Sequence, residues 1–552
     1  MLALFTVLQI ATAQGPVVPP AERTLEARMS GMDLRAPTSP GSLAPSIVVD
    51  GEVLRLIWWE PDGAGHKLMT ARGDGETWDT PVPISTGGKY FVNWADTPRL
   101  GRGPGDMWLA TWAQMVGETP YAYGVAAAVS ADGGSSWRAI GLLHDDGTAT
   151  EHGFVSLVPD TQGVRAFWLD GRETLDGGAM TLRTARVAPD GQVSAPARLD
   201  DRVCDCCGTG AVVLETGPLV VYRDRSASEV RDTSVVSLSG DTHAPPQPVS
   251  QPGWQVPGCP VNGPTVARNG AHVAVAEFSA ALGQDVLLVQ SSDAGRSWSP
   301  PVRVAGEDTL GRVDIAPLGS GFVVGWLAQV SDEQAVYRAR RVSVDGMAGP
   351  PVTLLSTSTS RRSGFPRVAV NGDQIVVAWT EVAQRTQVRV HQFDAALLGP
   401  ASEPLKPPTD KDEEPLIAWP GDLSVPTPSD GTLAFADRTG RPTLVHLWAT
   451  WCAPCRDELK VWTQHSQAWS DQGIALIGLA VDDKAERVQS LMDEAGATWP
   501  VGLIRSGSAR ARFGPDPVPR TLLFDGHGKL VWSHTGPIGH DARALQAAID
   551  GL

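Results

Sequence analysis

The sequence lacks two features that would each indicate a particular class of partner. It has no uninterrupted apolar run near the roughly 18 residues that a membrane-spanning helix needs, so no membrane span is expected. It also has no excess of positive charge, since 62 acidic residues outnumber 45 basic ones and the formal net charge is -17. Because this charge opposes contact with phosphates, nucleic acid is not an expected partner.

Cysteine is scarce as well, and its placement is informative. The 552 residues include only 6 cysteines, but 59 glycines, 44 prolines and 19 tryptophans, a composition that favours many turns and short strands. The cysteines form a middle group and a late pair: Cys204, Cys206, Cys207 and Cys259, then Cys452 and Cys455. In an exported protein such groups indicate disulfides and redox pairs. The chain length predicts two or more domains.

The first residues predict export. An apolar run of about nine residues is followed by Ala11-Thr12-Ala13, which has the small-x-small form of a signal-peptidase site. No Lys or Arg precedes the run, yet the pattern favours a signal peptide over residues 1–13 and a periplasmic or secreted protein. No cysteine follows this site, so no lipid anchor is expected.

A repeat fills the first four hundred residues. Pairs of short apolar runs joined by a Gly or Asp turn recur seven times, and each second run ends in an aromatic residue. These aromatic residues are Trp59, Trp112, Trp168, Tyr222, Phe278, Trp326 and Trp379. They stand about 48 to 56 positions apart, a length suited to four strands and their loops. The pattern predicts an all-β propeller over residues 40–405 with seven blades, or six blades and an irregular unit, with the aromatic residues buried between the blades.

Two turns carry a sharper signature, S-x-D-x-G-x-x-W, at 130–137 and 291–298, and a degenerate copy ends at Trp78. In such a turn the Asp carboxylate accepts backbone N–H groups, Gly takes a positive φ and Trp packs between blades. The signature resembles the Asp box of the sialidase superfamily, and the resemblance covers roughly residues 40 to 400. It implies a sialidase-like propeller, in which the box builds turns and performs no chemistry.

Sialidase activity is an unfavoured alternative. The family implies an arginine trio, a Tyr nucleophile backed by Glu and an acid-base Asp near the axis. The arginine motif usual before the first box is absent, although Arg99, Arg312 and Arg367 lie on or beside first strands. Only five tyrosines occur, namely Tyr90, Tyr121, Tyr123, Tyr222 and Tyr337. Tyr222 takes one of the repeated aromatic positions that are expected to be packed between blades. Such arginines are usually solvated or paired.

The middle cysteines are expected to lie together. Cys204, Cys206 and Cys207 precede the first strand of the fourth unit, and Cys259 precedes that of the fifth, so adjacent blades bring them to one mouth of the channel. Disulfides are the favoured interpretation in an exported protein, with a bridge from Cys206 or Cys207 to Cys259. The alternatives are a soft-metal site, with Cu(I) the leading candidate for clustered thiolates, and a redox-active role.

The last part of the chain differs in pattern. Residues 406–422 are rich in Pro and charge and predict a linker. Within residues 423–552 a buried strand, Thr443 to Trp448, runs into Trp451-Cys452-Ala453-Pro454-Cys455 and a helix. This arrangement predicts an α/β thioredoxin fold. Cys452, at the helix N-terminus, is expected to be the attacking thiolate, and Cys455 to resolve the mixed disulfide.

The segment LVHLWATWCAPCRDEL resembles the TlpA/ResA-type periplasmic thioredoxin family. The resemblance implies that Glu458 is a buried acid that relays protons and that Pro519, in Val518-Pro519-Arg520-Thr521, is a cis proline facing the disulfide. Arg520 departs from the Thr common in the family. The implied partners are protein thiols or disulfides, such as apocytochrome c or copper-centre cysteines, and an upstream electron donor.

The sequence therefore favours an exported thiol-disulfide oxidoreductase whose propeller binds or scaffolds a partner. A copper- and thiol-handling protein, and a glycoside hydrolase with a redox appendage, are the alternatives. No cofactor is required for the favoured function. The direction of electron flow depends on reduction potentials, which spacing does not encode.

Overall fold

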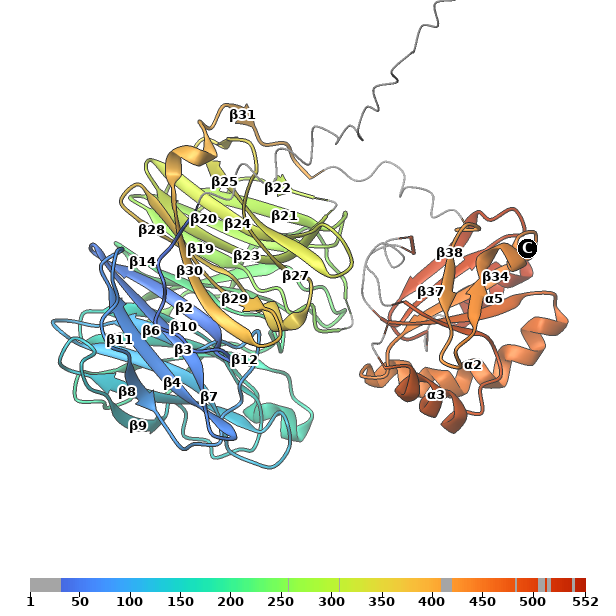
Figure 1. The fold of residues 1–552 in the computed structure, drawn as a ribbon, viewed down its shortest axis with the longest axis horizontal. Helices are drawn as coiled ribbons and strands as arrows, with labels where there is room; N and C mark the ends of the chain where they lie inside the picture. Colours follow the sequence, from blue (N-terminus) through green and yellow to red (C-terminus); the bar gives the residue numbers. More distant parts are fainter. Residues whose placement is uncertain are drawn as a thin grey trace, which may run out of the picture.

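The computed structural model describes residues 31–256, 258–306, 308–408, 419–481, 484–504, 512–513, 518–538 and 542–552. The predicted signal peptide, residues 1–13, and most of the predicted linker lie outside these ranges. Two bodies of different architecture follow one another along the chain, an all-β body first and an α/β body second (Figure 1).

The all-β body is a propeller of seven blades, as the repeat predicts. Each blade is an antiparallel sheet with its first strand innermost. The first three blades are β2–β5 (Leu43–Asp50, Val53–Asp62, Gly65–Gly73, Val82–Ser85), β6–β9 (Arg99–Arg102, Trp108–Met115, Tyr123–Ser130, Arg138–Leu142) and β10–β13 (His152–Asp160, Gly163–Asp170, Thr181–Val187, Ala197–Asp200).

The next three blades follow the same order. They are β14, β15, β16 and β18 (Gly210–Leu214, Gly217–Arg223, Thr233–Ser239, Gln247–Ser250), β19–β22 (Thr265–Asn269, His272–Ser279, Asp285–Ser291, Val302–Ala305) and β23, β24, β25 and β27 (Thr309–Leu318, Gly321–Gln329, Gln334–Val342, Val352–Ser358). Short strands extend two of these sheets beyond the four strands expected: β17 (Thr242–His243), β26 (Met347–Ala348) and β31 (Glu403–Pro404).

The seventh blade closes the ring with a strand from the start of the described chain. Its inner strands are β28 (Arg367–Asn371), β29 (Gln374–Val382) and β30 (Thr386–Asp394). Its outermost strand is β1 (Met32–Asp33), in which Met32 pairs with Gln392. The first strand of the described chain therefore completes the seventh blade, which closes the ring.

The repeated aromatic residues pack between neighbouring blades, as predicted. All seven lie on the second strand of a blade and are at most 7% exposed. Trp168, for example, packs with side chains of the second and third blades, and Trp326 with those of the fifth and sixth. Burial of these large apolar surfaces holds adjacent sheets together.

The two S-x-D-x-G-x-x-W turns have the predicted hydrogen bonds. The Asp132 carboxylate accepts the backbone N–H of Ser136 at 2.9 Å, and Gly134, with φ of 86°, donates its N–H to the Ser130 hydroxyl at 2.8 Å. Hydrogen bonds from the hydroxyl and N–H of Ser136 hold the pKa of Asp132 down, at about 2. Asp293 is bound in the same way in the fifth blade.

The second body has the predicted thioredoxin fold. Five strands form one sheet in the order β36-β35-β34-β37-β38, with β34 parallel to β35 and antiparallel to β37. These strands are Val501–Leu503, Ala475–Ala480, Thr443–Trp448, Arg520–Phe524 and Leu530–Thr535 respectively, and the helices are α2 (Ala453–Asp471), α3 (Ala485–Glu494) and α5 (Ala542–Asp550). A hairpin of β32 (Ser424–Pro426) and β33 (Thr432–Ala434) precedes the sheet.

Helix α2 lies against the sheet through one apolar face. Cys455, Leu459, Trp462 and Trp469 are each at most 7% exposed and belong to the core of this body. The three- and four-residue spacing between the first members repeats on one side of a helix, as the sequence predicts. In the described residues, no helix is both long and apolar enough to cross a membrane.

Candidate redox site and the propeller mouth

The propeller cysteines lie in connections that lead to innermost strands. Cys206 and Cys259 form a disulfide with their Cα atoms 6.0 Å apart, which is one of the two bridges that the sequence favours. Cys204 and Cys207 are free thiols, both buried, with their sulfur atoms 3.2 Å apart. The sulfur atoms of Cys204, Cys206 and Cys207 all lie within 4.8 Å of one another.

An arginine supports the charged form of one of these thiols. Arg231, in the connection between β15 and β16, donates from Nη1 to the Cys204 sulfur at 3.1 Å. Burial alone would raise the pKa of Cys204, but the hydrogen bond from Cys207 and the positive charge of Arg231 outweigh it and lower that pKa below its usual range. Burial and the neighbouring Cys204 raise the pKa of Cys207. The site therefore favours the thiolate form of Cys204 over that of Cys207.

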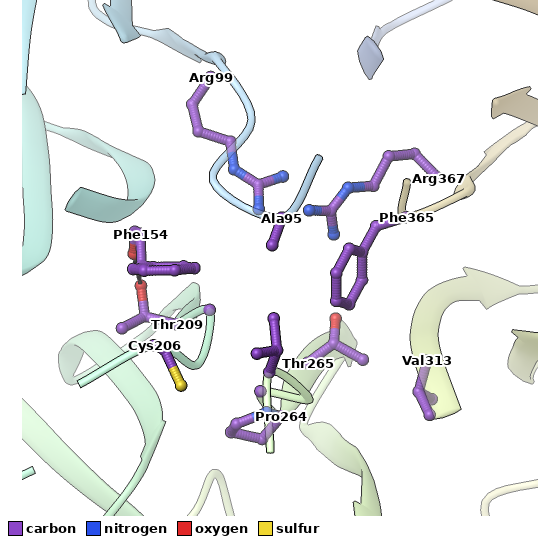
Figure 2. A pocket seen from close by; sticks show the side chains of 13 residues that line it. Ala95, Arg99, Phe154, Cys206, Thr209, Pro264, Thr265, Val313, Phe365 and Arg367 are labelled. Carbon is purple, nitrogen blue, oxygen red and sulfur yellow. Dashed lines mark hydrogen bonds between the residues drawn. The ribbon is translucent and has the colours of Figure 1, made fainter. Parts of the chain in front are cut away.

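The three arginines singled out in the sequence do not converge. Arg99 and Arg367 line a cavity of about 30 Å³, together with Cys206 (Figure 2). Arg312 instead donates to the Ser363 hydroxyl at 2.6 Å and lies over the Trp94 ring. The Tyr222 hydroxyl is bound to Asp200 and its ring is fully buried between blades. Arg99, Arg312 and Arg367 therefore do not form the arginine trio that a sialidase-type site implies.

Sequence reasoning missed two buried polar clusters in the propeller. The Tyr123 hydroxyl donates to Glu151 at 2.5 Å, and burial raises the pKa of Glu151 to about 7. Asp146 lies 2.7 Å from His144 Nδ1 and 3.2 Å from His152 Nε2. Arg172, 3.4 Å from Asp146, already supplies a positive charge to the second cluster, which is an ion-pair network of the fold. No local motif marks these residues.

The late cysteine pair lies where strand β34 leads into helix α2. Cys452 is the N-cap of α2, and its sulfur accepts the Cys455 backbone N–H at 3.3 Å. The two residues form a disulfide with Cα atoms 5.3 Å apart. Cys455 is fully buried, whereas Cys452 is 6% exposed and follows Trp451, which is 54% exposed. When the pair is reduced, the helix N-terminus favours the thiolate form of Cys452.

A proline loop lies against the Cys452 sulfur. The Val518–Pro519 peptide bond is cis, as the resemblance implies. The Val518 carbonyl oxygen is 3.7 Å from the Cys452 sulfur, and Arg520 begins β37 with a buried side chain. The loop therefore forms one wall beside Cys452.

Glu458 is a buried acid on the same side of α2 as Cys455. Its carboxylate accepts the backbone N–H of Ile538. Burial raises its pKa from the usual 4.5 to about 7. The neighbouring His446, 4.0 Å away, is neutral because burial lowers its pKa to about 3. Glu458 can therefore gain or lose a proton near neutral pH, which suits a proton relay.

Comparison with known proteins finds a family model that matches the C-terminal part of the chain. The Redoxin family model matches residues 422–549. The C-terminal body is a Redoxin domain.

Curated relatives match a fifth of the chain or less. The thiol-disulfide oxidoreductase ResA of Bacillus subtilis is 26% identical over 104 residues, which are 19% of this chain and 58% of that protein. The thiol:disulfide interchange protein DsbE of Escherichia coli is 32% identical over 100 residues, which are 18% of this chain and 52% of that protein. The chain thus spans between half and three fifths of the length of these two relatives.

A solved structure also matches part of the chain. It is a secreted Mycobacterium tuberculosis disulfide oxidoreductase homologous to E. coli DsbE, with 17% identity and a TM-score of 0.22. The match covers 25% of this chain and all of that chain.

The titration of Glu458 predicts how the stability of the Redoxin domain depends on pH. The folded domain holds the Glu458 proton up to about pH 7, while the unfolded chain releases it near 4.5. The folded state therefore binds more protons between these values, and the free energy of unfolding falls as pH rises through them. We expect a loss of about 3 kcal/mol between pH 4.5 and pH 8 that the Glu458→Gln variant does not show.

Urea unfolding at pH 4.5 and pH 8, followed by hydrogen exchange in α2 peptides, measures this difference. The change in the free energy of unfolding of the Glu458→Gln variant is subtracted from that of the wild type, which removes the contribution of all other titrating groups. Equal changes in wild type and variant across this range would show that Glu458 titrates normally.

Proposed function

We propose that the chain is an exported thiol-disulfide oxidoreductase, in which the Redoxin domain exchanges disulfides through Cys452 and Cys455 and the propeller binds or scaffolds the partner. The observation that carries the proposal is the Cys452–Cys455 disulfide at the N-terminus of α2, beside the cis Val518–Pro519 bond. The names of the relatives, thiol-disulfide oxidoreductase and thiol:disulfide interchange protein, support the same chemistry.

The difference in exposure between the two cysteine residues supports the order of reaction that we propose. Cys452, the more exposed residue, attacks a substrate disulfide and forms a mixed disulfide, while one substrate sulfur leaves as a thiolate. Cys455 then attacks Cys452, which restores the domain disulfide and releases the second substrate sulfur. Glu458 accepts the proton that Cys455 loses, because it lies one turn further along the same side of α2.

The partners are protein thiols or disulfides. The resemblance to TlpA/ResA-type proteins favours apocytochrome c or the cysteines of copper-site proteins, with an upstream dithiol protein as electron donor. Arg520 follows the proline loop and is buried at the start of β37, at a position where Thr is common in TlpA/ResA-type proteins, and we expect this difference to affect the choice of partner.

Redox titration of the full chain tests the proposal. The protein is equilibrated with graded ratios of reduced and oxidised dithiothreitol, alkylated and mapped by mass spectrometry. We expect Cys452 and Cys455 to change together as one two-electron pair. A pair that stays oxidised at every ratio, or two residues that titrate separately, would overturn it.

The close sulfur atoms of the propeller favour a second candidate, a copper- and thiol-handling protein. Three cysteine sulfurs within 4.8 Å suit Cu(I), which prefers soft thiolate ligands. Cys204 and Cys207 would hold the ion, and Cys206 would join them once its disulfide opens. The ion would be cargo, and the Redoxin domain would keep its ligands reduced.

Metal content separates this candidate from the first. After reduction and anaerobic loading with Cu(I), we expect about one bound ion per chain in the wild type and a loss of at least about tenfold in affinity in the Cys207→Ser variant. The Cys452→Ser variant is the matched control, because it removes a cysteine outside the cluster. Equal binding by all three proteins would exclude this cysteine site.

A further inference from the structure

The exposed tryptophan of the redox centre contacts the propeller. Trp451 directly precedes Cys452, and its ring lies 5.2 Å from the guanidinium carbon of Arg361. Arg361 begins the short 3-10 helix η2 (Arg361–Ser363), in the connection between the sixth and seventh blades. The turn that carries the attacking cysteine thus meets a defined point of the propeller.

That point lies on the same face of the propeller as the middle cysteines. In a ring of four-stranded antiparallel blades, every connection from an outermost strand to the next innermost strand lies on one face. Arg361 occupies the connection before β28, Cys206 the one before β14 and Cys259 the one before β19. Trp94, in the connection before β6, is a fourth member of this face.

A chain of ring contacts leads from the redox centre to the cavity at this face. The Arg361 guanidinium also lies 5.7 Å from the Trp94 ring, and Trp94 stacks on Phe365 with ring centroids 5.7 Å apart. Phe365 and Cys206 line the same cavity, as Figure 2 shows. Three aromatic side chains therefore connect the turn before Cys452 with the wall that contains Cys206.

The disulfide at this mouth is open to attack on one side. Cys259 is exposed, whereas its partner Cys206 is only 9% exposed. Behind Cys206 lie the free thiols of Cys204 and Cys207. A nucleophile from outside the propeller reaches the Cys259 sulfur first, and the leaving sulfur is then Cys206.

We propose that the Cys206–Cys259 disulfide of the propeller is an intramolecular substrate of Cys452, so that the Redoxin domain opens the disulfide and controls how many free thiols the propeller mouth presents. The inference rests on the proposed function and names a substrate for it within the same chain.

The exchange balances in atoms and electrons. The Cys452 thiolate attacks the Cys259 sulfur, a Cys452–Cys259 bond forms, the Cys206–Cys259 bond breaks and its electron pair leaves on Cys206. Cys455, after giving its proton to Glu458, attacks Cys452 and releases Cys259 as a thiolate. Two electrons pass to the propeller pair, Cys206 and Cys259 take up two protons, and the Cys452–Cys455 disulfide forms. An external dithiol reductant then reduces that disulfide again.

Covalent attachment makes this transfer fast. Residues 406–422 of the sequence join the two bodies, and a short linker gives a tethered partner an effective concentration of roughly mM. The contact between Trp451 and Arg361 also orients the turn before Cys452 relative to the propeller. The rate at which the Cys206–Cys259 disulfide opens should therefore not depend on protein concentration.

Timed alkylation of the full chain tests the inference. Oxidised protein receives dithiothreitol, and the fraction of alkylated Cys259 is followed by mass mapping. We expect Cys259 to open at least about tenfold faster in the wild type than in the Cys452→Ser/Cys455→Ser variant, in which dithiothreitol must attack the propeller directly. Arg361→Ala should slow the opening, while its neighbour Arg362→Ala, which is also exposed, should not.

Two further measurements distinguish a failure of the intramolecular transfer from a failure of the proposed function. In the Cys455→Ala variant, a Cys452–Cys259 cross-linked peptide should accumulate to the same fraction over a hundredfold dilution. Turnover of a fluorogenic glutathione disulfide reports the Redoxin domain alone. If turnover persists while Cys259 opens equally fast with and without Cys452, the intramolecular transfer is wrong and the proposed function stands. If the wild type shows no turnover, the proposed function itself fails.

Discussion

Replacement of Cys452 with serine is expected to reduce exchange with an external disulfide by about 1,000-fold or more, because the attacking thiolate is lost. Cys452 caps α2 and is the more exposed sulfur of the pair, whereas Cys455 is fully buried. A serine hydroxyl at this position can still accept the Cys455 N–H, so the fold of the turn is retained. Turnover of a fluorogenic glutathione disulfide, with dithiothreitol as donor, measures the loss.

The Cys455→Ser variant is the matched control. It keeps the attacking thiol and lacks the resolving one, so we expect one mixed disulfide per chain and no sustained turnover. If Cys452→Ser instead formed the mixed disulfide and Cys455→Ser did not, the two roles would be reversed.

The second large effect concerns the propeller. Trp168→Ala is expected to lower its free energy of unfolding by about 3 to 5 kcal/mol, since a fully buried indole between two blades leaves a cavity. The Trp168 Nε1–H also donates to Asp170 at 2.8 Å, and its removal leaves that carboxylate with fewer partners. Urea unfolding, followed by hydrogen exchange in peptides of β11, reports this body separately from the Redoxin domain.

Tyr121→Ala provides the comparison for this substitution. Tyr121 is an aromatic residue of the second blade region but is 65% exposed, so its loss should change stability by less than about 0.5 kcal/mol. A change of less than about 1 kcal/mol for Trp168→Ala would mean that the repeated aromatic residues do not hold the blades together.

Periodic and local patterns explain how much of the fold could be predicted. Strand alternation and the recurring aromatic residues gave the seven blades, because each repeat buries the same position. The strand Thr443–Trp448 and the helix after it followed from a buried apolar run and a C-x-x-C motif. The association of Cys206 with Cys259 could be expected because both stand before innermost strands of adjacent blades.

Features that depend on contacts between distant residues could not be predicted. The closing strand Met32–Asp33 is two residues long and has no pattern of its own. Arg231 supports the Cys204 thiolate from a connection 27 residues away, and nothing in its neighbours marks that role. The contact of Trp451 with Arg361 joins two bodies whose separate patterns contain no information on how they meet.

The charge state of Glu458 also needed the structure. Its position three residues after Cys455 is visible in the sequence, but an exposed helix glutamate would have the same spacing. Burial is what raises its pKa to about 7, against the opposing effect of the hydrogen bond from the Ile538 N–H.

The pH dependence of alkylation of Cys452 and Cys455 in the reduced full chain tests the central claim most directly. We expect Cys452 to react before Cys455. Its apparent pKa should lie well below the value of about 8.5 for an ordinary thiol, because the N-terminus of α2 stabilises its thiolate. Faster reaction of Cys455, or a Cys452 that titrates as an ordinary thiol, would contradict the assignment of Cys452 as the attacking sulfur.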